Sequence, residues 1–510
     1  MTLQAPTQRV RPDRLIDFRS TSPAGDAPRA ASQPNPAADA SGGHAGEAPL
    51  WHAMLGFVIP QTGSAALQLL SGTVTAIYFG QLLGRSALAV ASAFFPIFFL
   101  LVSFLIGLIA GGIVLVARAH GAGDRLQIKR VTGTTLVVCG LLSLAIATIG
   151  YLLSPRMLAA MATPPDILSA TIDYARVTFI SLPVVTLLFA YTFLLRGTGD
   201  AVTPLLAMAF CIGISLVLTP ALILGWGGLP QLGVTSAPWA NLVACAVSLP
   251  VLMIYLGVRG HPMAFDRDLA VRLRIDPVIV KPFFGIGIPG GIQTAVTSLS
   301  EVAVVVLVNP FGSSATAAYG AVNQVVGYLL APMQAVGLAA TVFAAQAVGA
   351  RKAGRLGAVT RIAAVMNLLV GATAVAILCL FSTSVLSWFV VDPVTLSIAR
   401  HALLMTLWSY LFVGISDVLA GVMRSTGTVV WPTAITISGI WLVQLPTAYL
   451  LSHAIGLEGV WLGYPAGFAA ALLAQAIYYG LVWRRRSGEG PDINVKQPSE
   501  HSPAARSAPG

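Results

Sequence analysis

The chain carries one segment twice, as LRGTGDAVTP at residues 195–204 and as MRSTGTVVWP at residues 423–432, which begin 228 positions apart. Two further pairs keep nearly the same spacing: GFVIP at 56–60 with GIGIP at 285–289, and RAHGAG at 118–123 with QAVGAR at 346–351. A constant offset over three well-separated segments indicates an internal duplication. The chain therefore consists of two similar halves that follow one another.

The amino-acid composition indicates that both halves are embedded in a lipid bilayer. Of the 510 residues, 56% are hydrophobic and 9% are charged, whereas a soluble domain carries about 25% charged residues. A bilayer core of ~30 Å needs ~20 apolar residues per helical span. Twelve such spans are predicted, at residues 53–80, 87–117, 130–153, 168–195, 202–225, 234–257, 283–308, 315–347, 358–381, 398–423, 431–452 and 459–483.

The predicted fold is an all-α polytopic membrane protein, with twelve transmembrane helices in two pseudo-symmetric six-helix bundles around a central cavity. The bundles are expected at residues 51–258 and 283–484, joined by a cytoplasmic linker at residues 259–282. Residues 1–50 and 485–510 are expected to be disordered cytoplasmic tails, because they lack apolar runs. Six prolines within or near the spans predict helix kinks: Pro60, Pro183, Pro220, Pro289, Pro332 and Pro446.

Basic residues indicate the orientation. They follow spans two, six, eight and twelve, whereas the opposite loops carry few of them. By the positive-inside rule both termini are cytoplasmic. The net charge of +10 then reflects orientation and contact with anionic membrane lipids, not nucleic-acid binding. We expect a monomeric, multi-pass protein of a bacterial cytoplasmic (inner) membrane.

At the repeated segments the chain resembles the multidrug and toxic compound extrusion (MATE) family. The features that carry the resemblance are the LRGxGDxxxP segment after span four, its echo after span ten, and the glycine-containing loops after spans two and eight. The resemblance implies a secondary active antiporter that exports small organic, usually cationic, compounds in exchange for protons or sodium ions. It implies no enzymatic activity and no cofactor besides the coupling ion.

The two LRGxGD-type segments are interpreted as hinge loops, because their glycines allow left-handed backbone angles and their prolines suit the first turn of the next helix. A simple tight connection between helices is the alternative. The residues concerned are Arg196, Gly197, Gly199, Pro204, Arg424, Gly427 and Pro432.

The first half departs from the family pattern. Family members that couple through this half carry acids and an amide at positions that correspond to Thr75, Ser215 and Thr219, none of which ionises. The sodium-coupled branch has second-half acids where this chain has Thr297 and Val413. Neither ion site is therefore carried over directly.

Two acids remain deep within the spans, Glu301 in span seven and Asp417 in span ten. A charged group near the bilayer centre costs about 2.5–3.5 kcal/mol on insertion scales, so both are candidates for proton or cation binding. A carboxylate that binds either a proton or a cationic substrate provides antiport. At 1.5 Å per residue, straight helices would place the two carboxylates roughly 20 Å apart in depth, which favours two stations, with one shared site as the alternative. The alternative is a structural hydrogen bond across a helix interface.

Further polar and aromatic residues could line the cavity, with helix packing as the alternative for each: Asn241, Gln293, Tyr319, Asn323, Gln324, Tyr410, Trp441 and Gln444. The four cysteines have no CxxC spacing and are expected to be small core residues. Neither a catalytic triad, a metal-ligand cluster, a P-loop nor a dinucleotide fingerprint is found, so no metal is expected.

Two other functional classes stay open. A flippase for a lipid-linked saccharide or another amphipathic metabolite would need a cationic cavity, whereas the candidate charges here are acidic. A membrane-embedded enzyme or scaffold would need a clustered catalytic constellation. A major facilitator would share the six-plus-six plan, but its basic loop motif is missing between Arg118 and Arg130.

Overall fold

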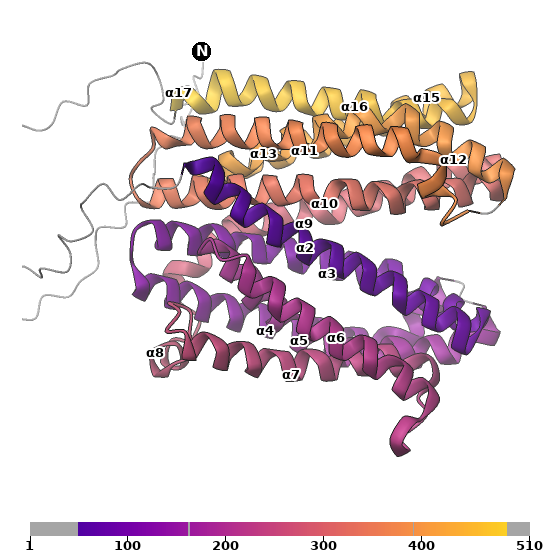
Figure 1. Cartoon of the computed structure of the whole chain (residues 1–510), viewed down its shortest axis with the longest axis horizontal. Coiled ribbons are helices and arrows are strands. Elements are labelled where there is room, and N and C mark those ends of the chain that lie inside the picture. The colour runs from indigo at the N-terminus through magenta and orange to yellow at the C-terminus, as the bar shows by residue number, and fades with distance from the viewer. Residues whose placement is uncertain (1–48, 162–163, 391, 487–510) are drawn as a thin grey trace, which may run out of the picture. The chain divides into compact units, whose positions relative to one another are not determined.

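The computed structural model describes residues 49–161, 164–390 and 392–486, which form helices joined by short loops (Figure 1). Within these residues, twelve helical segments are long and apolar enough to cross a membrane. Each overlaps one predicted span, so the predicted twelve-helix fold is confirmed. The predicted tails lie almost wholly outside the described residues.

The first six spans are α2 (Leu50–Tyr78) with its π-helical extension η1 (Phe79–Leu83), α3 (Arg85–Gly121), α4 (Arg125–Ala160), α5 (Pro165–Gly197), α6 (Val202–Leu224) and α7 (Ser236–Val258). The second six are α9 (Pro277–Val308), α10 (Ser313–Gly349), α11 (Arg355–Leu386), α12 (Pro393–Thr406) with α13 (Tyr410–Ser425), α14 (Val430–Ser438) with α15 (Leu445–Ile455), and α16 (Leu457–Ile477) with η7 (Tyr478–Trp483). Short segments complete spans ten to twelve: η5 (Leu407–Ser409), η6 (Gly439–Gln444) and α17 (Arg484–Arg486).

The outer faces of these helices are apolar. Leu152, Ile254 and Leu380 expose 68%, 67% and 80% of their surface. In water such exposed apolar side chains would favour aggregation, whereas in a bilayer they contact apolar lipid chains. Away from its ends, a helix satisfies its backbone polar groups within the segment, as the bilayer core requires. The chain is a multi-pass membrane protein.

The two halves meet mainly along α3 and α9, and α10 adds contacts to α2 and α3. Glycines allow the backbones of α3 and α9 to approach closely. A Cβ atom built on Gly111 would lie 2.7 Å from the carbonyl oxygen of Phe283, and one on Gly287 would lie 2.6 Å from that of Leu108. Small residues at such crossings let membrane helices pack through van der Waals contact.

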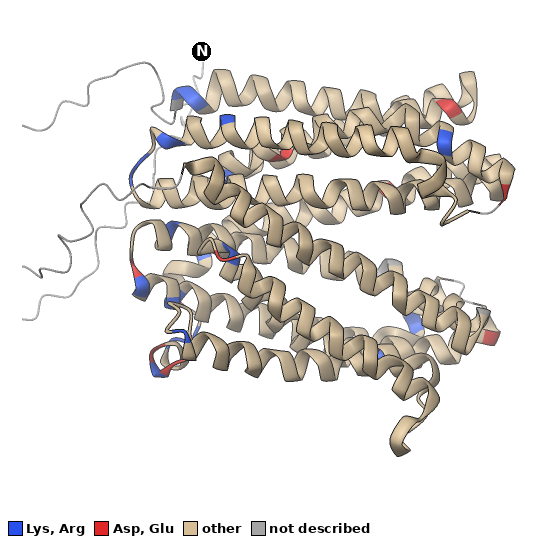
Figure 2. Cartoon of the chain, in the orientation of Figure 1, with Lys and Arg blue, Asp and Glu red and all other residues tan. Residues whose placement is uncertain are grey.

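Basic side chains gather at one end of the helices, where the loops after α3, α7 and α10 lie (Figure 2). We call this the basic end. The longest of these loops, residues 259–276, contains the short helix α8 (Arg267–Val271) and leads directly into α9. Because α9 begins at Pro277, the loop is shorter than the predicted linker of residues 259–282.

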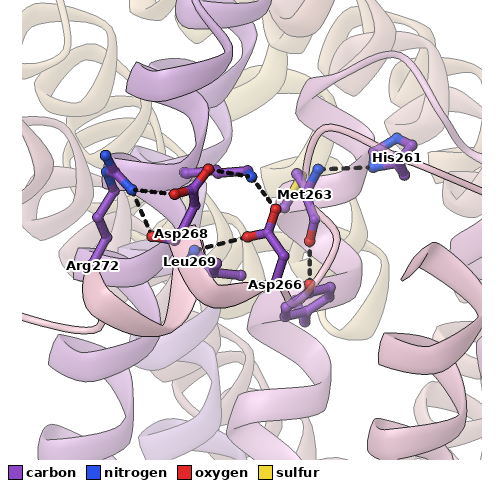
Figure 3. A network of polar contacts seen from close by, with 8 residues as sticks. His261, Met263, Asp266, Asp268, Leu269 and Arg272 are labelled. Carbon is purple, nitrogen blue, oxygen red and sulfur yellow. Dashed lines mark hydrogen bonds and ion pairs between the residues drawn. The ribbon is translucent and has the colours of Figure 1, made fainter.

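This loop is fastened to the first half (Figure 3). The phenol of Tyr191 donates a hydrogen bond to the carbonyl of Met263, and Lys129 forms an ion pair with Asp266. Next to these contacts, Arg272 pairs with Asp268 at 3.7 Å.

Thr134 on α4 also donates to the carbonyl of Arg274, at 3.2 Å. The connection between the halves is therefore held by α4 and α5 until shortly before α9 begins.

One expectation about individual residues needs correction. Cys379 is exposed on the outer face of α11, although Cys139, Cys211 and Cys245 are buried as expected. Five of the six prolines lie inside α-helices and Pro446 directly follows the π-helical η6, so helix kinks at these positions stay a prediction. The non-helical backbone within α11 occurs at Phe381, which no proline causes.

Candidate functional site

Glu301 lies on α9, two turns beyond the close crossing with α3. That crossing ends at Thr294, whose hydroxyl donates to the carbonyl of Ser103 at 2.8 Å. Beyond this point one face of α9 is exposed, with Leu299 and Val302 about half exposed, while Ser300 and Val304 stay buried. The Glu301 side chain is itself exposed. The described helices therefore do not enclose its carboxyl group.

Three tyrosines of the second half lie within electrostatic reach of Glu301: Tyr319 on α10, Tyr410 at the start of α13 and Tyr464 on α16. Their rings are at most 9% exposed. The hydroxyls of Tyr319 and Tyr464 are 3.1 Å apart and share a hydrogen bond. Asn323, one turn along α10, also bonds the Tyr319 phenol. We call Tyr319, Tyr410 and Tyr464 the tyrosine cluster.

Aromatic packing holds the tyrosine cluster in place. Tyr319 stacks on Trp461, with ring centroids 6.0 Å apart and an angle of 12° between the rings. Phe468 on α16 contacts both Tyr410, at 5.2 Å, and Tyr464, at 5.8 Å. Each tyrosine thus has its ring in an apolar setting, and the hydroxyls of Tyr319 and Tyr464 bond each other. The cluster lies within electrostatic reach of one carboxyl, which suits binding of a proton or a cation.

Asp417 lies in different surroundings. It packs against α10, where a Cβ atom on Gly337 would lie 3.4 Å from that of Asp417. Its charge interacts with the guanidinium of Arg424, two turns closer to the basic end. The charge interactions of Glu301 and Asp417 are with different groups, which agrees with two stations. Asp417 is thus placed to balance the charge of Arg424.

The corresponding position of the first half confirms that the halves differ here. Phe189 stands 228 residues before Asp417, and Arg196 stands 228 before Arg424. Arg196 is 1% exposed and lies in the last turn of α5, not in the loop. Its guanidinium stacks over Phe193 at 4.1 Å. An aromatic face replaces the carboxylate as the partner of this arginine.

Two of the five remaining cavity candidates, Gln293 and Gln444, contact a neighbouring helix. Gln293 accepts a hydrogen bond from Thr433 at 3.3 Å and so links α9 to α14. Asn241 accepts a weak bond from the Cys245 thiol. Gln444 is buried against α16, where a Cβ on Gly467 would strike it. Trp441 has a buried indole nitrogen without a hydrogen-bond acceptor among the described residues, and Gln324 is half-buried.

The first-half positions highlighted by the family pattern hold satisfied hydroxyls. Thr75 donates to the carbonyl of Ser71 at 2.8 Å, and Thr219 donates to that of Ser215 at 2.7 Å. The hydroxyl groups of Thr75 and Thr219 are therefore hydrogen-bonded to the backbone of their own helices. The hinge glycines behave as predicted at Gly199 and Gly427, which both adopt a φ of +90°.

Sequence reasoning missed Tyr464 and Trp461. Both are on α16 and are three residues apart, so they lie on one face of the helix. That spacing is visible in the sequence, but it also fits ordinary packing of a membrane helix. Only the positions of α10 and α13 show that this face is turned toward Tyr319.

Comparison with known proteins agrees with the fold and with the repeat. The family model described as MatE matches the chain twice, at residues 60–221 and 289–450. A probable multidrug resistance protein, YoeA of Bacillus subtilis, is 40% identical over 439 residues, covering 86% of this chain and 95% of that protein. A FAD transporter of Shewanella oneidensis is 26% identical over 84% of this chain and 95% of its own length.

Among solved structures, a D35N mutant of the Vibrio cholerae MATE transporter VcmN superposes with a TM-score of 0.79. It is 21% identical, and the match covers 86% of this chain and 97% of that one. At this identity the likeness concerns the fold alone.

Proposed function

The chain belongs to the MatE family of membrane transport proteins, which are not enzymes, and on that premise we propose that it is a secondary active antiporter. It exports small organic, cationic compounds in exchange for protons or sodium ions. The basic end faces the cytoplasm of a bacterial cell, so that both termini are cytoplasmic, and the protein works as a monomer within the inner membrane.

One observation carries the proposal: Glu301 is an exposed carboxyl group within electrostatic reach of the tyrosine cluster, on a membrane-spanning helix. Its ionised form attracts a cation. Protonation removes the charge and so weakens the attraction. Because proton and substrate compete for one carboxylate, an inward proton gradient releases the substrate on the outer side.

Asp417 is a second candidate for binding the coupling ion, in addition to Glu301. Its charge lies within electrostatic reach of Arg424. A flippase for anionic headgroups is less well supported, because the exposed charge beside the tyrosine cluster is negative.

The test is transport into and out of proteoliposomes with proton and sodium gradients imposed separately. The substrates are a cationic dye, a neutral compound and FAD, the last because one relative is named a FAD transporter. Glu301→Gln should abolish gradient-driven transport of the dye. The matched control is Glu458→Gln, because Glu458 lies at the start of α16 in an exposed pair with His401.

Gradient-driven transport of the dye by Glu301→Gln at the unsubstituted rate would refute the role of this carboxylate. Preference for FAD over the dye would refute the cationic substrate class. If neither gradient drove transport of any compound by the unsubstituted protein, antiport itself would be wrong.

A further inference from the structure

The repeated segments meet each other at the basic end. On α3, Arg118 donates from Nε to the carbonyl of Ser425, the last residue of α13, at 2.8 Å. On α10, Gln346 donates from Nε2 to the carbonyl of Gly197, the last residue of α5, at 3.1 Å. Gln346 is 228 residues after Arg118, and Ser425 is 228 after Gly197. The two bonds are therefore copies of one contact, and each joins one half to the other.

A pair of glycines brings the donor helices together. A Cβ atom on Gly121 would collide with the carbonyl oxygen of Gln346, and one on Gly349 would collide with that of Arg118. Gly349 follows Gly121 by 228 residues. The ends of α3 and α10 thus cross in reciprocal contact, each glycine accommodating the backbone of the other helix.

A second pair of glycines lies against the donor side chains. Gly199 and Gly427 share a φ of +90° and follow the two acceptor helices. A Cβ on Gly199 would lie 3.4 Å from Nε2 of Gln346, and a Cβ on Gly427 would lie 3.5 Å from Nη2 of Arg118. Each of the two repeated segments, LRGTGD and its echo, therefore contacts the hydrogen-bond donor side chain of the opposite half, Gln346 or Arg118.

The chemistry of the two bonds differs. The last carbonyls of a helix have no partner within the helix and carry a partial negative charge. Arg118 meets such a carbonyl with a full positive charge, whereas Gln346 offers a neutral amide. Hydrogen bonds to charged groups contribute more than neutral ones. The Arg118 bond should therefore contribute more to holding the halves together.

We propose that Arg118 and Gln346 form a latch that closes the basic end of the route between the halves, and that this end opens only when both bonds break. The proposal rests on the proposed transport function. Both residues are positioning residues, since they hold helix ends and touch no substrate. Because the contacts are related by the duplication, one rotation of the halves about their interface breaks both together.

The experiment measures access to Ser425, which is fully buried at the junction. Ser425→Cys keeps the backbone carbonyl that Arg118 binds, and Cys379→Ala removes the exposed native thiol. A membrane-impermeant maleimide is applied to the full-length protein in detergent, and labelling is followed at each cysteine by mass spectrometry. Buried Cys139 on α4 reports general unfolding in the same sample.

The latch predicts that Arg118→Ala raises the labelling rate of the introduced thiol roughly 10- to 100-fold, and Gln346→Ala roughly 2- to 10-fold. Arg118→Gln keeps a neutral donor and should label more slowly than Arg118→Ala. Cys139 should stay unlabelled throughout.

Unchanged labelling in both alanine variants would overturn the latch, as would an equal rise at Cys139. The measurement needs no transport, so it separates the two proposals. Faster labelling without any gradient-driven transport would support the latch and reject the antiporter. Unchanged labelling in a protein that transports would do the opposite.

Discussion

The crossing of α3 and α9 predicts opposite outcomes for two alanine substitutions only two residues apart. A Cβ on Gly287 would lie 2.6 Å from the carbonyl oxygen of Leu108 and 2.8 Å from its Cδ1, whereas a Cβ on Gly285 would meet nothing within 4 Å. A backbone carbonyl cannot rotate away, so Gly287→Ala must push the helices apart. Overpacking of this kind costs about 1–3 kcal/mol.

The comparison isolates that cost. Replacing glycine by alanine inside a helix favours the helix by about 1 kcal/mol, and this gain is common to both variants. The free energy of unfolding of Gly287→Ala should therefore be lower than that of Gly285→Ala by the overpacking cost alone. Reversible unfolding in mixed micelles with increasing sodium dodecyl sulfate, followed by circular dichroism, measures the difference.

A third variant refines the test. Adding Leu108→Ala to Gly287→Ala removes the Cδ1 contact but leaves the carbonyl, so it should not restore stability. Equal unfolding free energies for the two single variants would refute the close contact between the halves. A less stable Gly285→Ala would refute it as well.

Three further outcomes are expected. Asp417→Asn removes a negative charge within electrostatic reach of Arg424 and should lower the unfolding free energy by about 0.5–3 kcal/mol; an unchanged thermal transition would contradict that interaction. Burial lowers the pKa of His261 below its usual 6.5. In its neutral form, Nδ1 of His261 accepts a hydrogen bond from the Met263 N–H at 3.2 Å. This bond contributes stability that is fully present above pH 6.5 and is lost as the pH falls through the lowered pKa. Hydrogen exchange of the backbone amides in residues 259–266, corrected for intrinsic rates, should therefore become faster as the pH falls. His261→Asn should abolish this pH dependence. If the dependence persisted in that variant, His261 would not be its cause. Gly427→Ala forces a non-glycine residue to a φ of +90° and should cost roughly 1–2 kcal/mol of unfolding free energy, whereas Gly354→Ala, in open space at a φ of −60°, should cost little.

Much of the fold could be predicted because it depends on properties that act locally. Burial in lipid requires long apolar helices, so the spans are visible in composition. Duplication leaves a constant offset, so the two halves are visible in alignment of the chain with itself. Glu301 and Asp417 could be singled out because an acid within a span is costly wherever the neighbouring helices lie.

Other features depend on which helices become neighbours. The acceptors of Arg118 and Gln346 are backbone carbonyls, which every residue has, so no residue pattern identifies them. Arg196 looked like a loop residue because it stands beside Gly197, yet α5 extends through both.

The loop between the halves has a consequence for how such a chain can be divided. Helices α4 and α5 bind this loop as far as Arg274. Most of the loop therefore packs as part of the first half, and only a few residues before Pro277 lie outside these contacts. A gene split inside residues 259–274 would separate a fragment from its own packing surface. A split between Ile275 and Asp276 would leave the contacts of this loop within the first fragment, while Asp276 still caps α9 in the second through the Val278 N–H.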